Sequence, residues 1–198
     1  MGNESSMSYK SRKKAYLYLM RVARNLNLYP RRPMMRYIKQ HYQQPLVGVE
    51  IGVSEGMHAN NILSTLSIKK LYLVDPYTNY SGYGNGSLDF EKIYKNAQKR
   101  LLRFNSKIQF IRDFSEITAN QIPDNIDFVY IDACHRYEYV KKDIELYYPK
   151  VKKGGLIGGH NFEIRFKDVC KEVLEFADKH SLELQGEGID WWFIKKML

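Results

Sequence analysis

Residues 46–56 read LVGVEIGVSEG, and this stretch is the strongest indication of the fold class. Its first half is an apolar, partly β-branched run that is short enough for a buried strand. The run contains one acid, Glu50, and it passes into a turn that carries Gly52 and Gly56. A strand that runs directly into a glycine-bearing turn predicts a ligand site beyond the carboxyl end of that strand.

The rest of the chain alternates between strand-like and helix-like segments. Further apolar runs cover residues 70–74, 107–111, 126–131 and 155–158, and helical periodicity covers 58–66, 88–104, 115–121 and 137–148. This alternation predicts a doubly wound α/β fold with a mostly parallel sheet. After a helix at 165–180, two strand-like runs at 182–185 and 190–195 lie so close together that we expect an antiparallel last strand.

The positive charge of the chain lies at its N-terminal end. Residues 1–44 contain ten of the 31 Lys and Arg residues but only one acid, Glu4, and therefore carry the whole formal charge of +9. Helical patterns at 8–28 and 33–42 predict a basic helical arm over residues 1–44, ahead of a domain over 45–198. The arm is suited to nucleic acid, an anionic surface, a dimer contact or a cover over the site, or it is only a solvated helix face.

The cysteine content and the hydropathy pattern indicate the compartment. Cys134 and Cys170 are far apart and form no C-x-x-C pair, which argues against a disulfide framework or a zinc knuckle. No apolar run approaches the ~20 residues that a membrane-spanning helix needs. We therefore expect a soluble, cytoplasmic protein without a membrane span.

The turn after the first strand does not have the usual dinucleotide pattern. It reads G-x-S-x-G through Gly52, Ser54 and Gly56, with Glu50 two residues ahead, and G-x-G-x-x-G is missing. An acid at this place repels phosphate, so the expected ligand carries cationic groups. S-adenosylmethionine has an ammonium and a sulfonium group and no phosphate, and the E-x-G-x-x-x-G form resembles the first motif of class I methyltransferases.

A second resemblance covers the later strand ends. Residues 128–138 read FVYIDACHRYE, and residues 140–162 contain KKGG and GGHNF. These segments resemble a small-molecule O-methyltransferase-like branch of the class I methyltransferases, with I-D-x-x-H-x-Y-E and G-H-D-Y-like strand ends. The resemblance covers about residues 45–198 and implies a Rossmann-like class I methyltransferase fold.

The resemblance implies S-adenosylmethionine as the cofactor. The turn at Glu50 is expected to hold the methionine part, and Asp75, which ends the second run, suits both ribose hydroxyls because of its spacing from Glu50. Phe114 is expected against the adenine ring. The full set of expected cofactor residues is Glu50, Gly52, Ser54, Gly56, Asp75, Asp113, Phe114, Ser115 and Asp132.

Methyl transfer to a hydroxyl group needs a base, because the methyl group on the sulfonium is already activated. His135, just after the strand end at Asp132, is the candidate base, and these two residues form the expected catalytic pair. Some relatives bind a divalent metal ion here, whose ligands would be Asp132, His160 and Asn161. Cys134 and the His160-Asn161 pair replace more acidic positions of those relatives, which weakens a Mg²⁺ site and leaves a softer ion or no ion open.

The sequence therefore predicts an S-adenosylmethionine-dependent methyltransferase that acts on a hydroxyl oxygen of a small-molecule acceptor. One alternative is a nucleic-acid methyltransferase, for RNA, that grips its substrate with the basic arm. Another is a non-catalytic module that binds S-adenosylmethionine. A homodimer is a further option for the arm.

Overall fold

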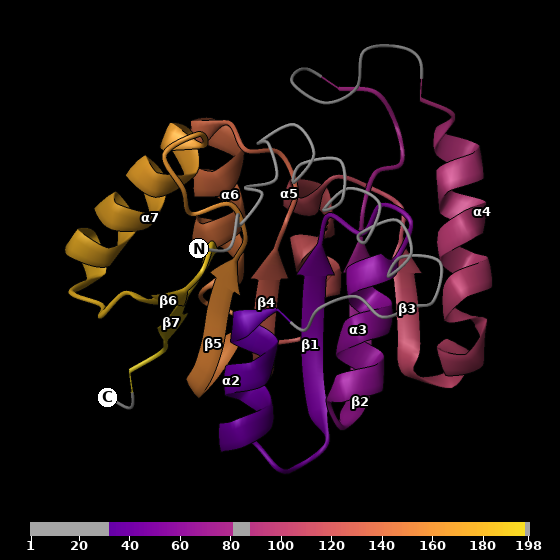
Figure 1. Cartoon of the computed structure of the whole chain (residues 1–198), viewed down its shortest axis with the longest axis horizontal. Coiled ribbons are helices and arrows are strands. Elements are labelled where there is room, and N and C mark those ends of the chain that lie inside the picture. The colour runs from indigo at the N-terminus through magenta and orange to yellow at the C-terminus, as the bar shows by residue number, and fades with distance from the viewer. Residues whose placement is uncertain (1–31, 81–87, 197–198) are drawn as a thin grey trace, which may run out of the picture. The chain divides into compact units, whose positions relative to one another are not determined.

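A seven-stranded sheet forms the middle of the domain (Figure 1). The structure, a computed structural model, describes residues 32–80 and 88–196. The strands are β1 (Leu46–Ile51), β2 (Ile68–Val74), β3 (Ile108–Ile111), β4 (Ile126–Ile131), β5 (Val151–Gly159), β6 (Gln185–Glu187) and β7 (Asp190–Ile194). They lie in the order β3-β2-β1-β4-β5-β7-β6, and β7 is antiparallel to both of its neighbours while the other neighbouring pairs are parallel. The predicted doubly wound sheet with an antiparallel last strand is confirmed.

Helices connect the strands close to the predicted places. They are α2 (Pro33–His41), α3 (Met57–Thr65), α4 (Phe90–Leu101), α5 (Ser115–Thr118), α6 (Tyr137–Tyr147) and α7 (Lys167–His180), with 3-10 turns η1 (Leu102–Lys107) and η2 (Ala119–Gln121). Asp89 begins α4, because its carboxylate accepts a hydrogen bond from the backbone N–H of Lys92 at 2.9 Å. Within the described ranges, no helix is long and apolar enough to cross a membrane.

One predicted strand forms later in the sequence than expected. The run at 182–185 was expected to pair, but Leu182 and Leu184 instead pack beside the apolar layer that α7 covers. Pairing begins at Gln185, which lies opposite Trp192 of β7. The apolar pattern therefore identified partly buried side chains, while the backbone pairing begins only at the last residue of the predicted run.

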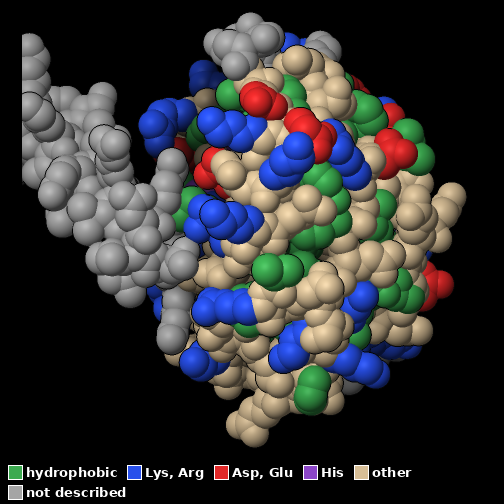
Figure 2. Space-filling model, turned by 90° about the vertical axis from the view of Figure 1, so that its right-hand side faces the viewer, with side chains coloured by type: hydrophobic (Ala, Val, Ile, Leu, Met, Phe, Trp, Pro, Cys, Tyr) green, Lys and Arg blue, Asp and Glu red, His purple; other side chains and the backbone are tan. Residues whose placement is uncertain are grey.

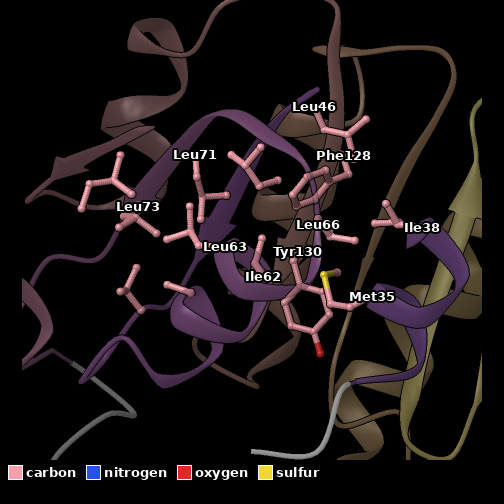
Figure 3. Close-up of a cluster of buried hydrophobic side chains, with 14 of the residues drawn as sticks. Met35, Ile38, Leu46, Ile62, Leu63, Leu66, Leu71, Leu73, Phe128 and Tyr130 are labelled. Carbon is pink, nitrogen blue, oxygen red and sulfur yellow. The ribbon is translucent and has the colours of Figure 1, made fainter. Parts of the chain in front are cut away.

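Two apolar layers, one on each face of the sheet, form the core. The first layer involves α2, α3 and α4, and the second involves α6 and α7. β1 serves both layers, since Leu46 packs in the first while Val49 and Ile51 pack in the second. Figure 1 shows α2 and α3 in front of the strands, and Figure 3 shows Met35 of α2 beside Tyr130 of β4 in the first layer.

The second helix of the predicted arm packs within the domain. Met34, Met35 and Ile38 of α2 are at most 1% exposed and belong to the first apolar layer. α2 therefore packs against later parts of the chain, and the boundary predicted at 44/45 stays a prediction. The predicted helix at 8–28 lies outside the described residues. The basic residues from Arg32 onwards therefore belong to the domain, and Arg32 itself reaches the candidate site.

Candidate active site

A cavity opens at the carboxyl ends of β1, β2 and β4. Its lining consists of Ile51, Gly52, Ser54, Val74, Asp75, Pro76, Tyr80, Phe114, Ser115, Asp132, Ala133, Cys134, Tyr139 and Asp143. Six of the predicted cofactor residues are among them: Gly52, Ser54, Asp75, Phe114, Ser115 and Asp132. The cavity lies where a doubly wound sheet binds its ligands.

Gly52 is required at the floor of this cavity. It has a φ of +87°, and a Cβ atom there would lie 2.2 Å from the backbone oxygen of Asp132. Its N–H donates to Val74 O at 2.9 Å, and the N–H of Asp132 donates to Ile51 O at 2.8 Å. The turn after β1 is thus held against the ends of both neighbouring strands, and a side chain has no room.

Asp75 shapes the turn and also faces the cavity. Its Oδ2 accepts hydrogen bonds from the backbone N–H groups of Val53 and Ser54, both at 2.9 Å. Its Oδ1 accepts from the backbone N–H of Tyr77 at 2.9 Å. A carboxylate offers about four lone-pair sites, so acceptor capacity remains for two hydroxyl groups.

Glu50, Gly56 and Asp113 do not line the cavity, in contrast to the prediction. The Glu50 side chain is fully buried, points towards α3, and lies 2.9 Å from Nδ1 of His58. Burial raises the pKa of Glu50 well above its usual value, although the nearby Arg32 lowers it. Gly56 forms the N-cap of α3, and Asp113 accepts from the N–H of Phe114 at 2.7 Å. Glu50 therefore lies beneath the turn on the α3 side of the sheet, because even-numbered β1 side chains point into the first apolar layer.

The end of the cavity near β3 is aromatic. The ring of Tyr80 lies 5.5 Å edge-on from Phe114 and 5.8 Å from Tyr139. The hydroxyl of Ser115 donates to the carboxyl group of Asp143, which is 3% exposed. Burial raises the pKa of Asp143 to about 7, against the opposing effect of the Ser115 hydrogen bond.

Sequence reasoning missed Asp143, although a signal was present. The buried positions of α6 are Val140, Asp143, Ile144 and Tyr147, which is an apolar stripe at helical spacing with one acid in it. An acid on a buried helix face is unusual unless it has a partner or a function. That position marked Asp143 as a candidate site residue.

A second, smaller cavity lies towards β5 and shares three residues with the first. It is lined by Ile131, Asp132, Ala133, Cys134, His135, Val140, His160, Val169 and Trp191. The Nε2 atom of His135 lies 2.9 Å from Oδ1 of Asn161 and 3.8 Å from Oδ1 of Asp132. The structure therefore brings together both predicted catalytic residues, Asp132 and His135, and the two other predicted metal ligands, His160 and Asn161.

Arg32 completes this end of the site and was not predicted. One of its guanidinium nitrogens lies 2.8 Å from Oδ2 of Asp132, and another donates to the hydroxyl of Tyr130 at 2.8 Å. Burial would raise the pKa of Asp132, but His135 and Arg32 outweigh it and hold that pKa well below its usual range. Asp132 is consequently ionised at neutral pH and paired with the Arg32 guanidinium.

The predicted metal ligands have other partners. Asp132 pairs with Arg32, and the Oδ1 atom of Asn161 faces His135. The Nδ1 atom of His160 lies 2.7 Å from Oδ1 of Asp190, a residue of β7 that is 1% exposed. Among residues 32–80 and 88–196, no group of three or more His, Cys, Asp or Glu side chains is arranged to hold a metal ion. The predicted metal site is therefore not supported, since a guanidinium group already pairs with its one carboxylate.

Comparison with known proteins identifies a family and one relative. The profile of a family described as a methyltransferase domain matches residues 49–162. Protein R132 of Acanthamoeba polyphaga mimivirus is 32% identical over 120 residues, which cover 57% of this chain and 49% of that protein. The chain thus spans about half the length of this relative.

Solved structures share the fold at low sequence identity. The O-methyltransferase NovP superposes with a TM-score of 0.63 at 15% identity, over 82% of this chain and 79% of NovP. SMU.1697c, a Streptococcus mutans methyltransferase in complex with SAH, gives 0.62 at 12%, over 82% and 95% of the two chains. An rRNA methylase from Streptococcus thermophilus gives 0.60 at 14%, over 85% and 99%. At these identities the likeness shows the fold alone.

Proposed function

Because the chain belongs to the methyltransferase domain family that matches residues 49–162, we propose that it is an S-adenosylmethionine-dependent enzyme that methylates a hydroxyl oxygen of a small molecule. The observation that carries this proposal is the pair of adjoining cavities over the ends of β1 and β4. One contains Gly52 and Asp75, the other contains His135, and Asp132 lies between them. A cofactor site and a base thus adjoin at one strand end.

The larger cavity has side chains that suit each part of the cofactor. The turn at Gly52 leaves its backbone open to the methionine part, and Asp75 accepts hydrogen bonds from the ribose hydroxyls. Phe114 and Tyr139 offer ring faces to the adenine, and Asp143 offers a carboxyl group to its edge. S-adenosylmethionine supplies a methyl group on a sulfonium, which a nucleophile can take by in-line displacement.

His135 acts as the base that removes the acceptor proton. Its Nε2 faces the amide oxygen of Asn161, which can only accept, so Nε2 carries the hydrogen and Nδ1 keeps a lone pair. Asn161 thereby fixes the tautomer and the ring orientation. The ring also packs 4.6 Å from Phe166, which limits its rotation. A hydroxyl group close to Nδ1 would lose its proton there as its oxygen accepts the methyl group.

The proposal is tested by methyl transfer to a panel of hydroxylated small molecules. Purified protein is incubated with S-adenosylmethionine and each compound, and methylated products are detected by mass spectrometry. His135→Ala should lower kcat for any accepted compound about 10²-fold or more, as expected for loss of a general base. His41→Ala removes an exposed imidazole at the end of α2 and serves as the matched control. An acceptor that His135→Ala methylates at the wild-type rate would contradict the role of His135.

A second candidate function is methylation of RNA, and one observation favours it. Lys and Arg side chains are spread over the face on which α4 lies and outnumber the Asp and Glu side chains there, which lie mostly in the upper half of the view (Figure 2). The exposed basic residues of α4 and of the chain that follows it up to residue 112 are Lys92, Lys95, Lys99, Arg103, Lys107 and Arg112. Phosphate contacts from such residues make binding strongly dependent on salt.

RNA binding separates the two candidates. If RNA is the substrate, its affinity should fall steeply between 50 mM and 200 mM salt, and its methylation should fall when Lys95 and Lys99 are both changed to Glu. If the acceptor is a small molecule, the same double variant should leave its turnover unchanged.

A further inference from the structure

We call the smaller cavity around Asp132 and His135 the acceptor end of the site and the larger cavity around Gly52 and Asp75 the cofactor end. The side chain of Arg32 reaches the acceptor end from outside the methyltransferase motifs. It lies immediately before α2 and is 12% exposed. Its guanidinium group bridges Tyr130 of β4 and Asp132, which directly follows that strand, at 2.8 Å from each. A planar guanidinium can hold two such partners at once in a fixed geometry.

A buried network holds Arg32 in this place. The Tyr130 hydroxyl donates to Oδ1 of Asp190 at 3.1 Å, and the backbone N–H of Met34 donates to Oδ2 of Asp190 at 3.2 Å. Figure 3 shows the Tyr130 ring among the apolar side chains with its hydroxyl directed away from them. The start of α2, the end of β4 and β7 are thus tied together around one buried carboxylate, so Arg32 is positioned before any ligand arrives.

This arrangement conflicts with a divalent metal ion at the same place. Asp132 is the only carboxylate among the three predicted ligands, and Arg32 neutralises it. Bringing in a metal ion would require the guanidinium to leave, because the two cations would repel each other at this distance. His160 uses Nδ1 for Asp190, and Asn161 uses Oδ1 for His135, so the other two ligands are also engaged.

We propose that Arg32 provides the fixed positive charge that a divalent ion provides in metal-dependent relatives, and that methyl transfer by this chain needs no divalent metal. The inference rests on the proposed methyl transfer. Arg32 acts as a positioning residue, because it works through Asp132 and Tyr130. It offsets the negative charge of Asp132, which would otherwise oppose the negative charge that develops on the acceptor oxygen as His135 removes the proton.

The first part of the test measures metal binding directly and needs no turnover. The wild-type protein, treated with EDTA and dialysed, is titrated with Mn²⁺ and followed by electron paramagnetic resonance of the free ion. We expect no saturable Mn²⁺ binding up to about 1 mM Mn²⁺, a concentration far above the dissociation constant of a dedicated protein site. A single saturable Mn²⁺ site that is lost in Asp132→Asn would overturn the proposal, whether or not an acceptor has been found.

The second part measures methyl transfer by Arg32 variants. Arg32→Ala should lower kcat about 10²-fold while the KM for S-adenosylmethionine changes less than about 3-fold, since Arg32 does not line the cofactor cavity. Added guanidinium ion or Arg32→Lys should restore part of the rate, which a purely structural role would not allow. Arg36→Ala is the matched control and should behave as wild type. Arg36 is an exposed residue of α2 that pairs with Glu187 of β6.

The outcomes separate this inference from the proposed function. Loss of activity in Arg32→Ala, with rescue and with a rate that EDTA leaves unchanged, supports the inference. Activity that EDTA abolishes and Mg²⁺ or Mn²⁺ restores overturns it while leaving the methyltransferase proposal intact. Unchanged kcat in Arg32→Ala also overturns it. If Arg32→Ala fails to fold, as judged by its thermal unfolding, Arg32→Lys and the Mn²⁺ titration of the wild type decide.

Discussion

The two ends of the candidate site are built in different ways. At the cofactor end, Asp75 binds the backbone of the turn that follows the neighbouring strand, so a strand, its turn and the next strand end form a local unit. At the acceptor end, Arg32 reaches Tyr130, 98 positions away, and Met34 reaches Asp190, 156 positions away. The first end depends on a motif and the second on tertiary packing.

This difference implies that substitutions at the two ends should have different effects. Changes at the cofactor end should mainly reduce binding of S-adenosylmethionine or its product. Changes at the acceptor end should leave that binding intact and reduce turnover or stability. The following variants test this separation, from the largest expected effect to the smallest.

Gly52→Ala should have the largest effect. The new Cβ would lie 2.2 Å from Asp132 O, and the residue would have to keep a φ of +87°. We expect at least a 100-fold loss of affinity for S-adenosylhomocysteine, measured by calorimetry. Gly188→Ala is the matched control, because Gly188 has a φ of +64° but its nearest atom would be 3.9 Å away. The control should cost only about 1 kcal/mol, measured by urea unfolding. If urea unfolding of Gly52→Ala shows the same loss of unfolding free energy as Gly188→Ala, backbone strain and not the close approach to Asp132 matters at Gly52.

Asp143 should make folding stability fall as the pH rises. Burial raises its pKa to about 7, so between about pH 4 and pH 7 the folded protein holds a proton that the unfolded chain releases. The stability contribution of this group is therefore lost as the pH rises through that window, by up to about 1.4 kcal/mol per pH unit.

The measurement compares urea unfolding of the wild type and Asp143→Asn at pH 5 and pH 8. The variant should lose less stability between the two pH values, by about 3 kcal/mol. Asp178→Asn, an exposed change on α7, should follow the wild type. A wild type and an Asp143→Asn variant with parallel pH profiles would contradict the raised pKa.

Asp190→Asn tests the buried network at the acceptor end. An amide has one acceptor oxygen in place of two, so it cannot serve Tyr130, His160 and Met34 together. We expect a loss of about 2 kcal/mol in the free energy of unfolding and a lower kcat, with S-adenosylhomocysteine affinity nearly unchanged. Glu187→Gln, an exposed neighbour on β6, should cost less than about 0.5 kcal/mol. A loss of cofactor affinity in Asp190→Asn would show that the two ends are coupled.

Tyr77→Phe should have the smallest effect. The Tyr77 hydroxyl donates to the backbone oxygen of Ser54 at 2.9 Å and steadies the turn at the cofactor end. Losing one hydrogen bond costs about 1 kcal/mol, so the affinity for S-adenosylhomocysteine should fall about 5-fold. An effect on turnover without an effect on affinity would place Tyr77 with the acceptor end.

The sequence predicted the features that depend on local pattern. β1 has the predicted bounds, Leu46–Ile51, because both of its faces are buried and its apolar run ends at the turn. Asp75 and Phe114 line the cavity as expected, since carboxyl ends of parallel strands meet at one edge of the sheet. Glu50 does not line the cavity, in contrast to the prediction. Side chains alternate along a strand, so Glu50 points to the opposite face from its neighbour Ile51 and into the core.

The acceptor end could not be derived in the same way. Arg32 lies in a basic stretch whose sequence does not distinguish one cation from another, and no local sequence pattern connects Arg32 to Asp132. Asp190 carries no motif, and its role depends on the antiparallel placement of β7 beside β5. The metal ligands were transferred from a resemblance, which contains no information about a side chain that arrives from α2.

Calorimetric titration of S-adenosylhomocysteine into the wild type, Gly52→Ala and Arg32→Ala measures whether the cofactor end and the acceptor end of the site are separate. We expect one site with micromolar affinity in the wild type, loss of binding in Gly52→Ala, and wild-type affinity in Arg32→Ala. Absence of binding to the wild type at millimolar concentration would contradict the methyltransferase assignment of the site. Loss of binding in a folded Arg32→Ala variant would contradict the separation of the two ends.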